Sequence, residues 1–201
     1  MGEGLSGTNT VQREVRRIWL TVLLGVALCL GTVLVIPSTY AAVDDLGVQM
    51  VLAGIDGFAP AAEVPFLSLT LNYILLYLYQ WIPSVPWYGL LLVLTQGVGL
   101  SLLFYCLTAK MREIPWLGLV FPFFLIFSAY TLLMVTFTQA TLTLIFGVAA
   151  VIASRYSDDP WPIATRRGLA VLLLWALLWR WKFGIYCLLF FAPLFMVQFA
   201  Q

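Results

Sequence analysis

The sequence predicts an all-α protein, a polytopic bundle of transmembrane helices. Of its 201 residues, 63% are hydrophobic and only 9% are charged, whereas a soluble domain carries about 25% charged residues. The apolar residues are grouped in long runs with almost no charge, and a helical run of about 20 such residues crosses the hydrocarbon core of a bilayer. No repeat, linker or low-complexity tract divides the chain, so we expect residues 1–201 to form a single transmembrane domain.

The first part of the chain is predicted to contain one span and a long external loop. Residues 1–17 include three arginines and precede the apolar run Ile18–Ile36. Because positive residues stay on the cytoplasmic side of a membrane, we expect residues 1–17 to form a cytoplasmic tail. Residues 37–85 contain four acidic residues and no Lys or Arg. This composition predicts that they lie on the external side.

Two helices within this loop are predicted to lie along the membrane surface. Leu46–Phe58 is short and interrupted by glycines, which suits an interfacial helix. Phe66–Ile82 carries several Tyr and Trp residues in its second half, a composition typical of the membrane interface. A second interpretation is that Phe66–Ile82 spans the membrane. That choice would move Lys110 and Arg112 to the external side, so the charge pattern favours the surface position.

The rest of the chain is predicted to supply further membrane-embedded helices. They are Trp87–Thr108, Trp116–Val135 and, after a polar turn at Thr136–Gln139, Leu142–Ala153. The last apolar block, Gly168–Phe199, is broken by Arg180 and Lys182. At about 1.5 Å per residue its first part is too short to cross fully, so we expect it to rise, turn within Arg180–Gly184 and return through Ile185–Phe199. The prediction is about six membrane-embedded helices plus one or two interfacial helices.

The composition also excludes several classes of protein. The chain has no histidine, which removes the usual general base at neutral pH and excludes a Ser-His-Asp arrangement. A net charge of +1 argues against a nucleic-acid partner. Any metal site would depend on carboxylates, which favour Mg²⁺ or Mn²⁺. Cys29, Cys106 and Cys187 occur singly in apolar runs and are predicted to be small buried hydrophobic residues.

Asp44 and Asp45 form the first candidate site, directly after the first span. Two adjacent carboxylates could supply a general base and hold a divalent metal. A second interpretation is that they cap the helix that begins near Leu46, since Asp is favoured at helix N-termini.

Arg180 and Lys182 form the second candidate site, within the last apolar block. A cation deep in a bilayer costs at least about 2.5–3.5 kcal/mol, so the pair is expected to need an anionic partner. A lipid phosphate is one such partner, because Arg binds it as a fork and Lys as a point charge. The other interpretation is that both side chains extend to the external headgroups, with Trp179 and Trp181 beside them at the interface.

The order of these features resembles the N-terminal half of the GT-C class of membrane glycosyltransferases. The likeness is to bacterial polyprenyl-phosphate-dependent enzymes of the protein mannosyltransferase and aminoarabinose transferase type. The segments that carry it are Val43–Gly47 (VDDLG), Ile82–Gly89 (IPSVPWYG), Thr136–Thr138 (TFT) and Trp179–Gly184 (WRWKFG).

The resemblance implies a function and a place for each candidate residue. It implies that the chain handles a polyprenyl-phosphate-linked sugar, with glycosyl transfer on the external face of a bacterial inner membrane. Asp44 or Asp45 would be the catalytic base or metal contact, and Arg180 and Lys182 would bind the lipid phosphate. Members of this class usually continue with further spans. The alternative is therefore a non-catalytic accessory or scaffold subunit that packs against another membrane protein chain.

Overall fold

The computed structural model is all-α, as the composition predicts. It describes residues 4–36, 39–40, 43–55, 57, 59–64, 67–111, 117–154 and 162–199. The helices in these ranges are α1 (Gly4–Val35), α2 (Val43–Ala53), α3 (Leu69–Trp81), α4 (Trp87–Met111), α5 (Leu117–Leu133), α6 (Phe137–Ser154), α7 (Ile163–Trp179) and α8 (Trp181–Phe199). Two short strands, β1 (Thr39–Tyr40) and β2 (Met134–Val135), complete the described part.

Three of the described helices are long and apolar enough to cross a membrane. The apolar segments are Gln12–Val35 in α1, Trp87–Ala109 in α4 and Phe137–Ser154 in α6. Two shorter apolar helices, Val120–Leu133 and Trp181–Pro193, lie in α5 and α8. The prediction of a membrane protein with transmembrane helices is therefore supported, and three of the six expected membrane-embedded helices reach spanning length.

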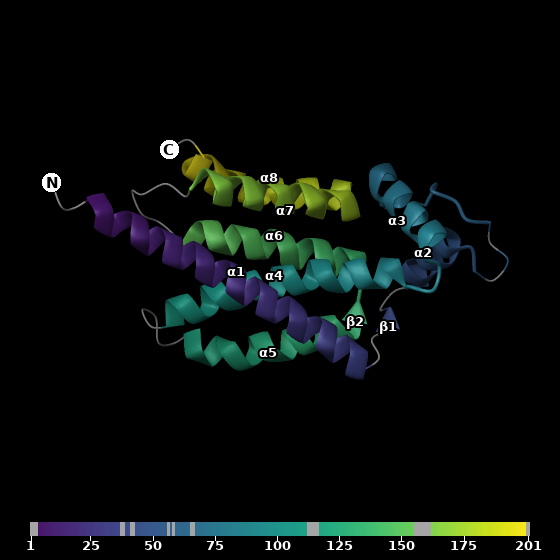
Figure 1. The fold of residues 1–201 in the computed structure, drawn as a ribbon, viewed down its shortest axis with the longest axis horizontal. Coiled ribbons are helices and arrows are strands. Elements are labelled where there is room, and N and C mark those ends of the chain that lie inside the picture. The colour runs from purple at the N-terminus through teal and green to yellow at the C-terminus, as the bar shows by residue number, and fades with distance from the viewer. Residues whose placement is uncertain are drawn as a thin grey trace.

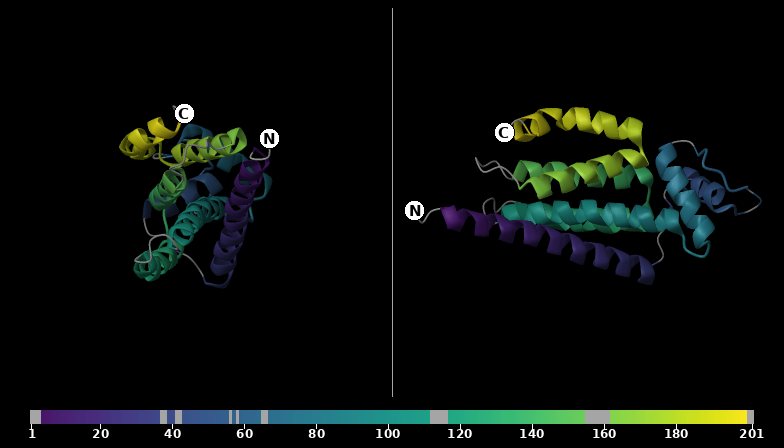
Figure 2. Two further views of the ribbon diagram at one scale, coloured as in Figure 1. Left: turned by 90° about the vertical axis from the view of Figure 1, so that its left-hand side faces the viewer. Right: turned by 45° about the horizontal axis from the view of Figure 1, so that its top comes forward.

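Six helices lie side by side and two lie beyond their ends. Figure 1 shows α1 and α4 to α8 running along the long axis, with α2 and α3 at the right-hand end. Figure 2 shows α3 crossing that end instead of joining the bundle. Helix α3 therefore does not run parallel to the helices of the bundle. Helix α1 begins well before the predicted Ile18, at Gly4, and α7 begins at Ile163 and not at Gly168. Three of the predicted limits, Phe58, Phe66 and Trp116, lie outside the described residues.

The centre of the bundle is the pair α4 and α6. Helices α1 and α5 pack against α4, whereas α7 and α8 pack against α6. Gly99 and Gly147 let α4 and α6 approach closely, because a Cβ atom on Gly99 would overlap the backbone of Thr143 and Leu144. Such contacts between small residues are a common means of packing helices within a membrane.

The end of α7 is tied to the start of α3. The backbone N–H of Ser68 donates to the carbonyl of Leu178 at 3.0 Å, and the Ser68 hydroxyl caps α3 by accepting from Leu71 N–H at 3.2 Å. Leu71 and Leu75 then turn their side chains into the same buried cluster as Trp179. The last apolar block breaks at Arg180 alone, since α7 ends at Trp179 and α8 begins at Trp181.

The region before α6 also differs from the prediction. The polar turn expected at Thr136–Gln139 is wrong, because α6 already begins at Phe137. The Thr136 hydroxyl accepts a hydrogen bond from Gln139 N–H at 3.0 Å and so caps the helix. The chain before it forms a parallel pair, with Thr39 opposite Met134 and Tyr40 opposite Val135, that the sequence did not predict.

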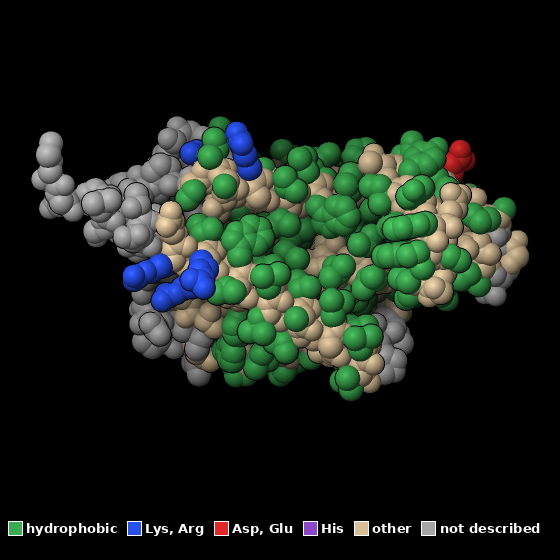
Figure 3. All heavy atoms as spheres, viewed as in Figure 1, with side chains coloured by type: hydrophobic (Ala, Val, Ile, Leu, Met, Phe, Trp, Pro, Cys, Tyr) green, Lys and Arg blue, Asp and Glu red, His purple; other side chains and the backbone are tan. Residues whose placement is uncertain are grey.

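The charged residues of the described part lie at the two ends of the bundle. Figure 3 shows an apolar surface along the helices, Lys and Arg side chains at one end and acidic side chains at the end with α2 and α3. The cations of α1 and α7 are Arg13, Arg16, Arg17, Arg166 and Arg167, and both helices begin at the end opposite α2 (Figure 1). Arg112, which was used to infer the topology, lies outside the described residues.

Candidate functional site

Asp45 lies in the first turn of α2 and its side chain is fully buried. One carboxylate oxygen, Oδ1, accepts a hydrogen bond from the Tyr88 hydroxyl at 2.5 Å and another from Phe137 N–H at 3.3 Å. These donors belong to α4 and α6. The carboxylate therefore joins three helices and does not cap its own helix, so the capping interpretation is wrong for Asp45.

The second carboxylate oxygen of Asp45, Oδ2, is buried and has no hydrogen-bond partner among the described residues. Burial raises the pKa of Asp45 above its ordinary value, and the neighbouring Asp44 charge adds to this effect. The bonds from Tyr88 and Phe137 and the charge of Arg180 act in the opposite direction. A buried acceptor without a partner costs about 1–3 kcal/mol of folding free energy. Oδ2 is therefore free to take a proton or to accept a hydrogen bond from a ligand.

Asp44 is exposed, although it is adjacent to Asp45 in sequence. It lies in the first turn of α2, where a negative charge interacts favourably with the helix dipole. Within the described ranges, no three His, Cys, Asp or Glu residues are grouped so that they could hold a metal ion. The two adjacent carboxyl groups therefore have different surroundings, one exposed and one buried.

Arg180 lies against the ring of Phe137, the residue whose N–H binds Asp45. Its guanidinium carbon is 5.0 Å from the centre of the Phe137 ring and 5.7 Å from that of Phe183, and Nη1 donates to the Thr138 hydroxyl. The side chain is half-buried. Phe137 thus contacts both groups. Its N–H donates to the Asp45 carboxylate, and its ring lies against the Arg180 guanidinium.

Asp45 and Arg180 interact electrostatically without a direct hydrogen bond. The Arg180 charge lowers the pKa of Asp45, yet the hydrogen bonds to Oδ1 come from Tyr88 and Phe137. The structure therefore brings together one acidic and one basic residue that are distant in sequence.

Lys182 is separate from this group. Its side chain is exposed, and its ammonium nitrogen is 5.5 Å from the centre of the exposed Trp181 ring. This position matches the interpretation in which a basic side chain extends to the interface. The two basic residues thus differ, because Arg180 faces the protein and Lys182 faces its surroundings.

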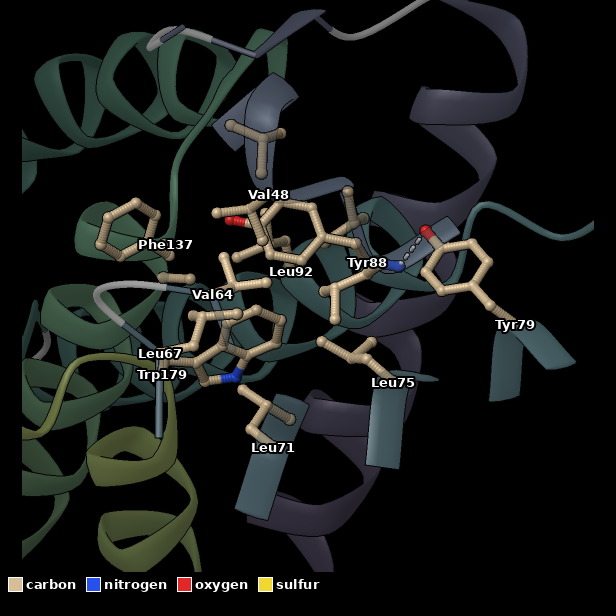
Figure 4. Close-up of a cluster of buried hydrophobic side chains, with 14 of the residues drawn as sticks. Val48, Val64, Leu67, Leu71, Leu75, Tyr79, Tyr88, Leu92, Phe137 and Trp179 are labelled. Carbon is tan, nitrogen blue, oxygen red and sulfur yellow. Dashed lines mark hydrogen bonds between the residues drawn. The ribbon is translucent and has the colours of Figure 1, made fainter. Parts of the chain in front are cut away.

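A row of aromatic rings next to Asp45 was not recognised from the sequence. The Tyr88 ring centre is 5.8 Å from that of Tyr40 and 5.8 Å from that of Trp179, and Tyr88 N–H donates to the Tyr79 hydroxyl at 3.0 Å. Figure 4 shows the Tyr88 side chain reaching from Tyr79 toward Phe137, with Trp179 below it. We name Tyr40, Tyr88 and Trp179 the aromatic row.

Three polar residues of the described helices, Asn72, Thr95 and Gln96, are buried and have mixed surroundings. The amide nitrogen of Asn72 donates to Val64 O at 3.1 Å, within the segment that holds α2 and α3. Gln96 is fully buried in α4, and neither its amide oxygen nor its nitrogen has a partner among the residues that the structure describes. Thr95, beside it, accepts hydrogen bonds from the indole nitrogens of Trp175 and Trp179 at 2.8 and 3.0 Å.

No family model, curated protein or solved structure matches this chain. A buried carboxyl group with a raised pKa can take a proton, and a half-buried guanidinium can bind an anion. Both lie at the same end of the bundle, where α2, α4, α6 and α8 meet.

Proposed function

We propose that this chain binds a polyprenyl-phosphate-linked sugar at the Asp45–Arg180 site and takes part in glycosyl transfer there. The observation that supports the proposal is the position of the two groups around Phe137, whose N–H binds Asp45 and whose ring lies under Arg180. An apolar bundle would place a lipid phosphate at the level of its ends. A lipid-linked anion is held at that level by its hydrocarbon chain, and a guanidinium binds phosphate oxygens with strong hydrogen bonds.

In this proposal Arg180 binds the phosphate and stabilises the charge that develops on it. The guanidinium already donates one hydrogen bond to Thr138, which leaves further N–H groups for phosphate oxygens. Electrostatic stabilisation of a departing group is often the largest contribution to catalysis. The two phenyl rings beside Arg180 hold it in place without neutralising it.

Asp45 is the proposed base. The acceptor oxygen forms a bond to the anomeric carbon as the bond between that carbon and the phosphate oxygen breaks. The phosphate leaves with the bonding electrons, and Oδ2 of Asp45 takes the acceptor proton. A raised pKa suits this role, because a carboxylate with an ordinary pKa is a weak base near neutral pH. Since Asp45 is fully buried, neighbouring side chains must move for the acceptor to reach it.

The proposed location is a bacterial inner membrane, with the N-terminus in the cytoplasm and α2 and α3 outside. The cations of α1 and α7 at the end opposite α2 support this orientation, because positive residues remain on the cytoplasmic side. The Asp45–Arg180 site would then face the external leaflet, where a polyprenyl-phosphate-linked sugar can meet an envelope acceptor.

Binding of polyprenyl monophosphate to the chain in lipid nanodiscs tests the role of Arg180. We expect Arg180→Gln to weaken binding about ten- to a hundredfold, because hydrogen bonds to charged groups contribute about 1.5–3 kcal/mol. Lys182→Gln is the matched control, since this cation is exposed, and it should change binding little. Equal losses in the two variants, or none in either, would contradict the proposal.

A second candidate function is a non-catalytic subunit of a larger membrane complex. The observation that favours it is the complete burial of Asp45, whose two hydrogen bonds join α2, α4 and α6 and could serve structure alone. Asp45→Asn separates the two functions, because Asn keeps an acceptor oxygen for Tyr88 and Phe137 but cannot take a proton. Loss of transfer with normal folding supports catalysis. Unchanged activity together with a co-purifying membrane protein supports the structural role.

A further inference from the structure

The Thr95 hydroxyl joins α4 to α7 through hydrogen bonds. It donates to the carbonyl of Leu91 in its own helix at 2.7 Å, and it accepts from the indole nitrogens of Trp175 and Trp179 at 2.8 and 3.0 Å. A hydroxyl has one donor and two acceptor positions, so all three are used. The two indole rings meet edge to face, with their centres 6.2 Å apart. One small side chain of α4 therefore fixes two neighbouring rings of α7.

This contact between α4 and α7 is buried. Thr95 is 3% exposed and Trp179 is fully buried. An indole N–H in apolar surroundings loses its acceptor only at a cost in free energy, so the bond to Thr95 keeps Trp179 against α4. The Trp179 ring also packs against that of Tyr88 in α4, with the two centres 5.8 Å apart. Trp179 is thus held by α4 at two points.

Arg180 directly follows Trp179 and lies outside both helices that flank it. Helix α7 ends at Trp179, and Arg180 has a non-helical backbone with φ −152° and ψ 78°. Its carbonyl accepts a hydrogen bond from Gly184 N–H in α8 at 2.8 Å. On the α7 side, the point from which the Arg180 side chain starts is set by Trp179. The guanidinium reaches the Phe137 ring from that point, at 5.0 Å from the ring centre.

We infer that Thr95 is a positioning residue, which through its bond to Trp179 holds the Arg180 guanidinium at Phe137 to receive a lipid phosphate. This inference rests on the proposed function, which assigns the phosphate to Arg180. Thr95 itself does not touch the ligand. It keeps the binding side chain in place before the ligand arrives, which reduces the cost of ordering that side chain on binding.

Binding of polyprenyl monophosphate to the chain in nanodiscs tests this role. Thr95→Val keeps the shape of the side chain but removes the acceptor, and we expect it to weaken binding about tenfold, since outer residues that orient metal ligands have effects of this size. Thr95→Ser keeps the hydroxyl and should bind as the unaltered chain does. Thr143→Val is the matched control, because Thr143 is equally buried and its hydroxyl donates to carbonyls of its own helix.

A double-mutant cycle shows whether Thr95 acts through Arg180. In the Arg180→Gln chain, Thr95→Val should cause no further loss of binding, because the side chain that it positions is gone. An equal loss in both backgrounds, or unchanged binding in Thr95→Val alone, would overturn the inference. If Thr95→Val does not fold, Trp179→Phe and Trp175→Phe replace it. Trp179→Phe should then weaken binding more than Trp175→Phe, and equal effects would count against the positioning role.

Nitrogen-15 NMR of the arginine side chains, recorded in detergent micelles without lipid, reads the position of Arg180 directly. Its signal, assigned by its loss in Arg180→Gln, should be displaced by the rings of Phe137 and Phe183. In Thr95→Val it should move to the range of the exposed arginines, and in Thr95→Ser it should stay. An unmoved signal in Thr95→Val overturns the inference. The expected movement, in a chain that binds no polyprenyl monophosphate or binds it independently of Arg180, supports the positioning and refutes the proposed function.

Discussion

The Asp45 carboxylate is held in place by hydrogen-bond donors on two other helices, α4 and α6. The Tyr88 hydroxyl and Phe137 N–H lie 43 and 92 residues away in sequence. The adjacent acidic pair in the sequence marks a candidate site. It cannot indicate which carboxyl is buried, because that depends on contacts between distant helices. Likewise, the local sequence does not distinguish Arg180 from Lys182. The tertiary packing makes Arg180 half-buried and leaves Lys182 exposed.

Replacement of Tyr88 by Phe tests the hydrogen bond to Asp45. The variant keeps the ring in the aromatic row but leaves the buried carboxylate with only the bond from Phe137 N–H. We expect a loss of about 1–3 kcal/mol in the free energy of unfolding, measured by denaturant unfolding in detergent micelles. Tyr77→Phe is the control, because Tyr77 is exposed on α3. Equal stability of the two variants would mean that the bond contributes nothing.

The raised pKa of Asp45 predicts a dependence of stability on pH. In the unfolded chain the carboxyl has its ordinary pKa of 3.8, and in the folded chain burial raises the pKa. The folded state therefore holds the proton more tightly. The stabilising contribution is complete below the unfolded pKa and is lost as the pH rises through the folded pKa.

Asp45→Asn should remove this part of the pH dependence, as seen in thermal unfolding midpoints measured over a pH series in detergent. Asp44→Asn should keep it but move it to lower pH, since the Asp44 charge helps to raise the pKa of Asp45. An identical pH profile in Asp45→Asn and the unaltered chain would show that the carboxyl does not titrate in this window.

At the scale of single helices, the sequence predicted most of what the structure contains. The uncharged runs that became α1, α4 and α5 were recognised from their length, and α3 from its aromatic residues. The start of α6 was missed, although Thr136 followed by Gln139 has the spacing of a capping box. The pairing of β1 with β2 could not be predicted, because each strand has only two residues and no periodicity.

The close approach of α4 and α6 gives a prediction with opposite signs for two glycines. Gly99→Ala should destabilise the chain by about 1–3 kcal/mol through overpacking, because its Cβ would overlap the backbone of α6. Gly31→Ala should be neutral or stabilising by up to about 1 kcal/mol, since alanine favours a helix and no atom lies within 4 Å of that Cβ position. Unfolding in detergent measures both. A stabilising Gly99→Ala would contradict the packing of this helix pair.

For the molecule as a whole, charge distribution is the property that the sequence describes best. It separated an acidic segment from basic segments, and the structure places α2 and α3 at the end opposite the basic residues of α1 and α7 (Figure 3). What the sequence could not give is the lateral arrangement. Helices α1 and α5 pack against α4, and helices α7 and α8 pack against α6. This arrangement depends on packing between distant residues.

The orientation in the membrane is a further prediction. In intact cells, a membrane-impermeant maleimide should label Ser84→Cys, which lies at the α2–α3 end and is exposed. Arg16→Cys, exposed at the opposite end, should react only after the cells are opened. The unaltered chain controls for its own three cysteines. The reverse pattern would place the Asp45–Arg180 site in the cytoplasm and remove the basis for transfer on the external face.

The most direct test of the central claim is an experimental map of the chain bound to polyprenyl monophosphate in a nanodisc. The account predicts phosphate density within hydrogen-bond distance of the Arg180 guanidinium, on the side of Phe137 that faces Asp45. Phosphate held by Lys182 at the surface, or at the basic end of α1 and α7, would contradict it.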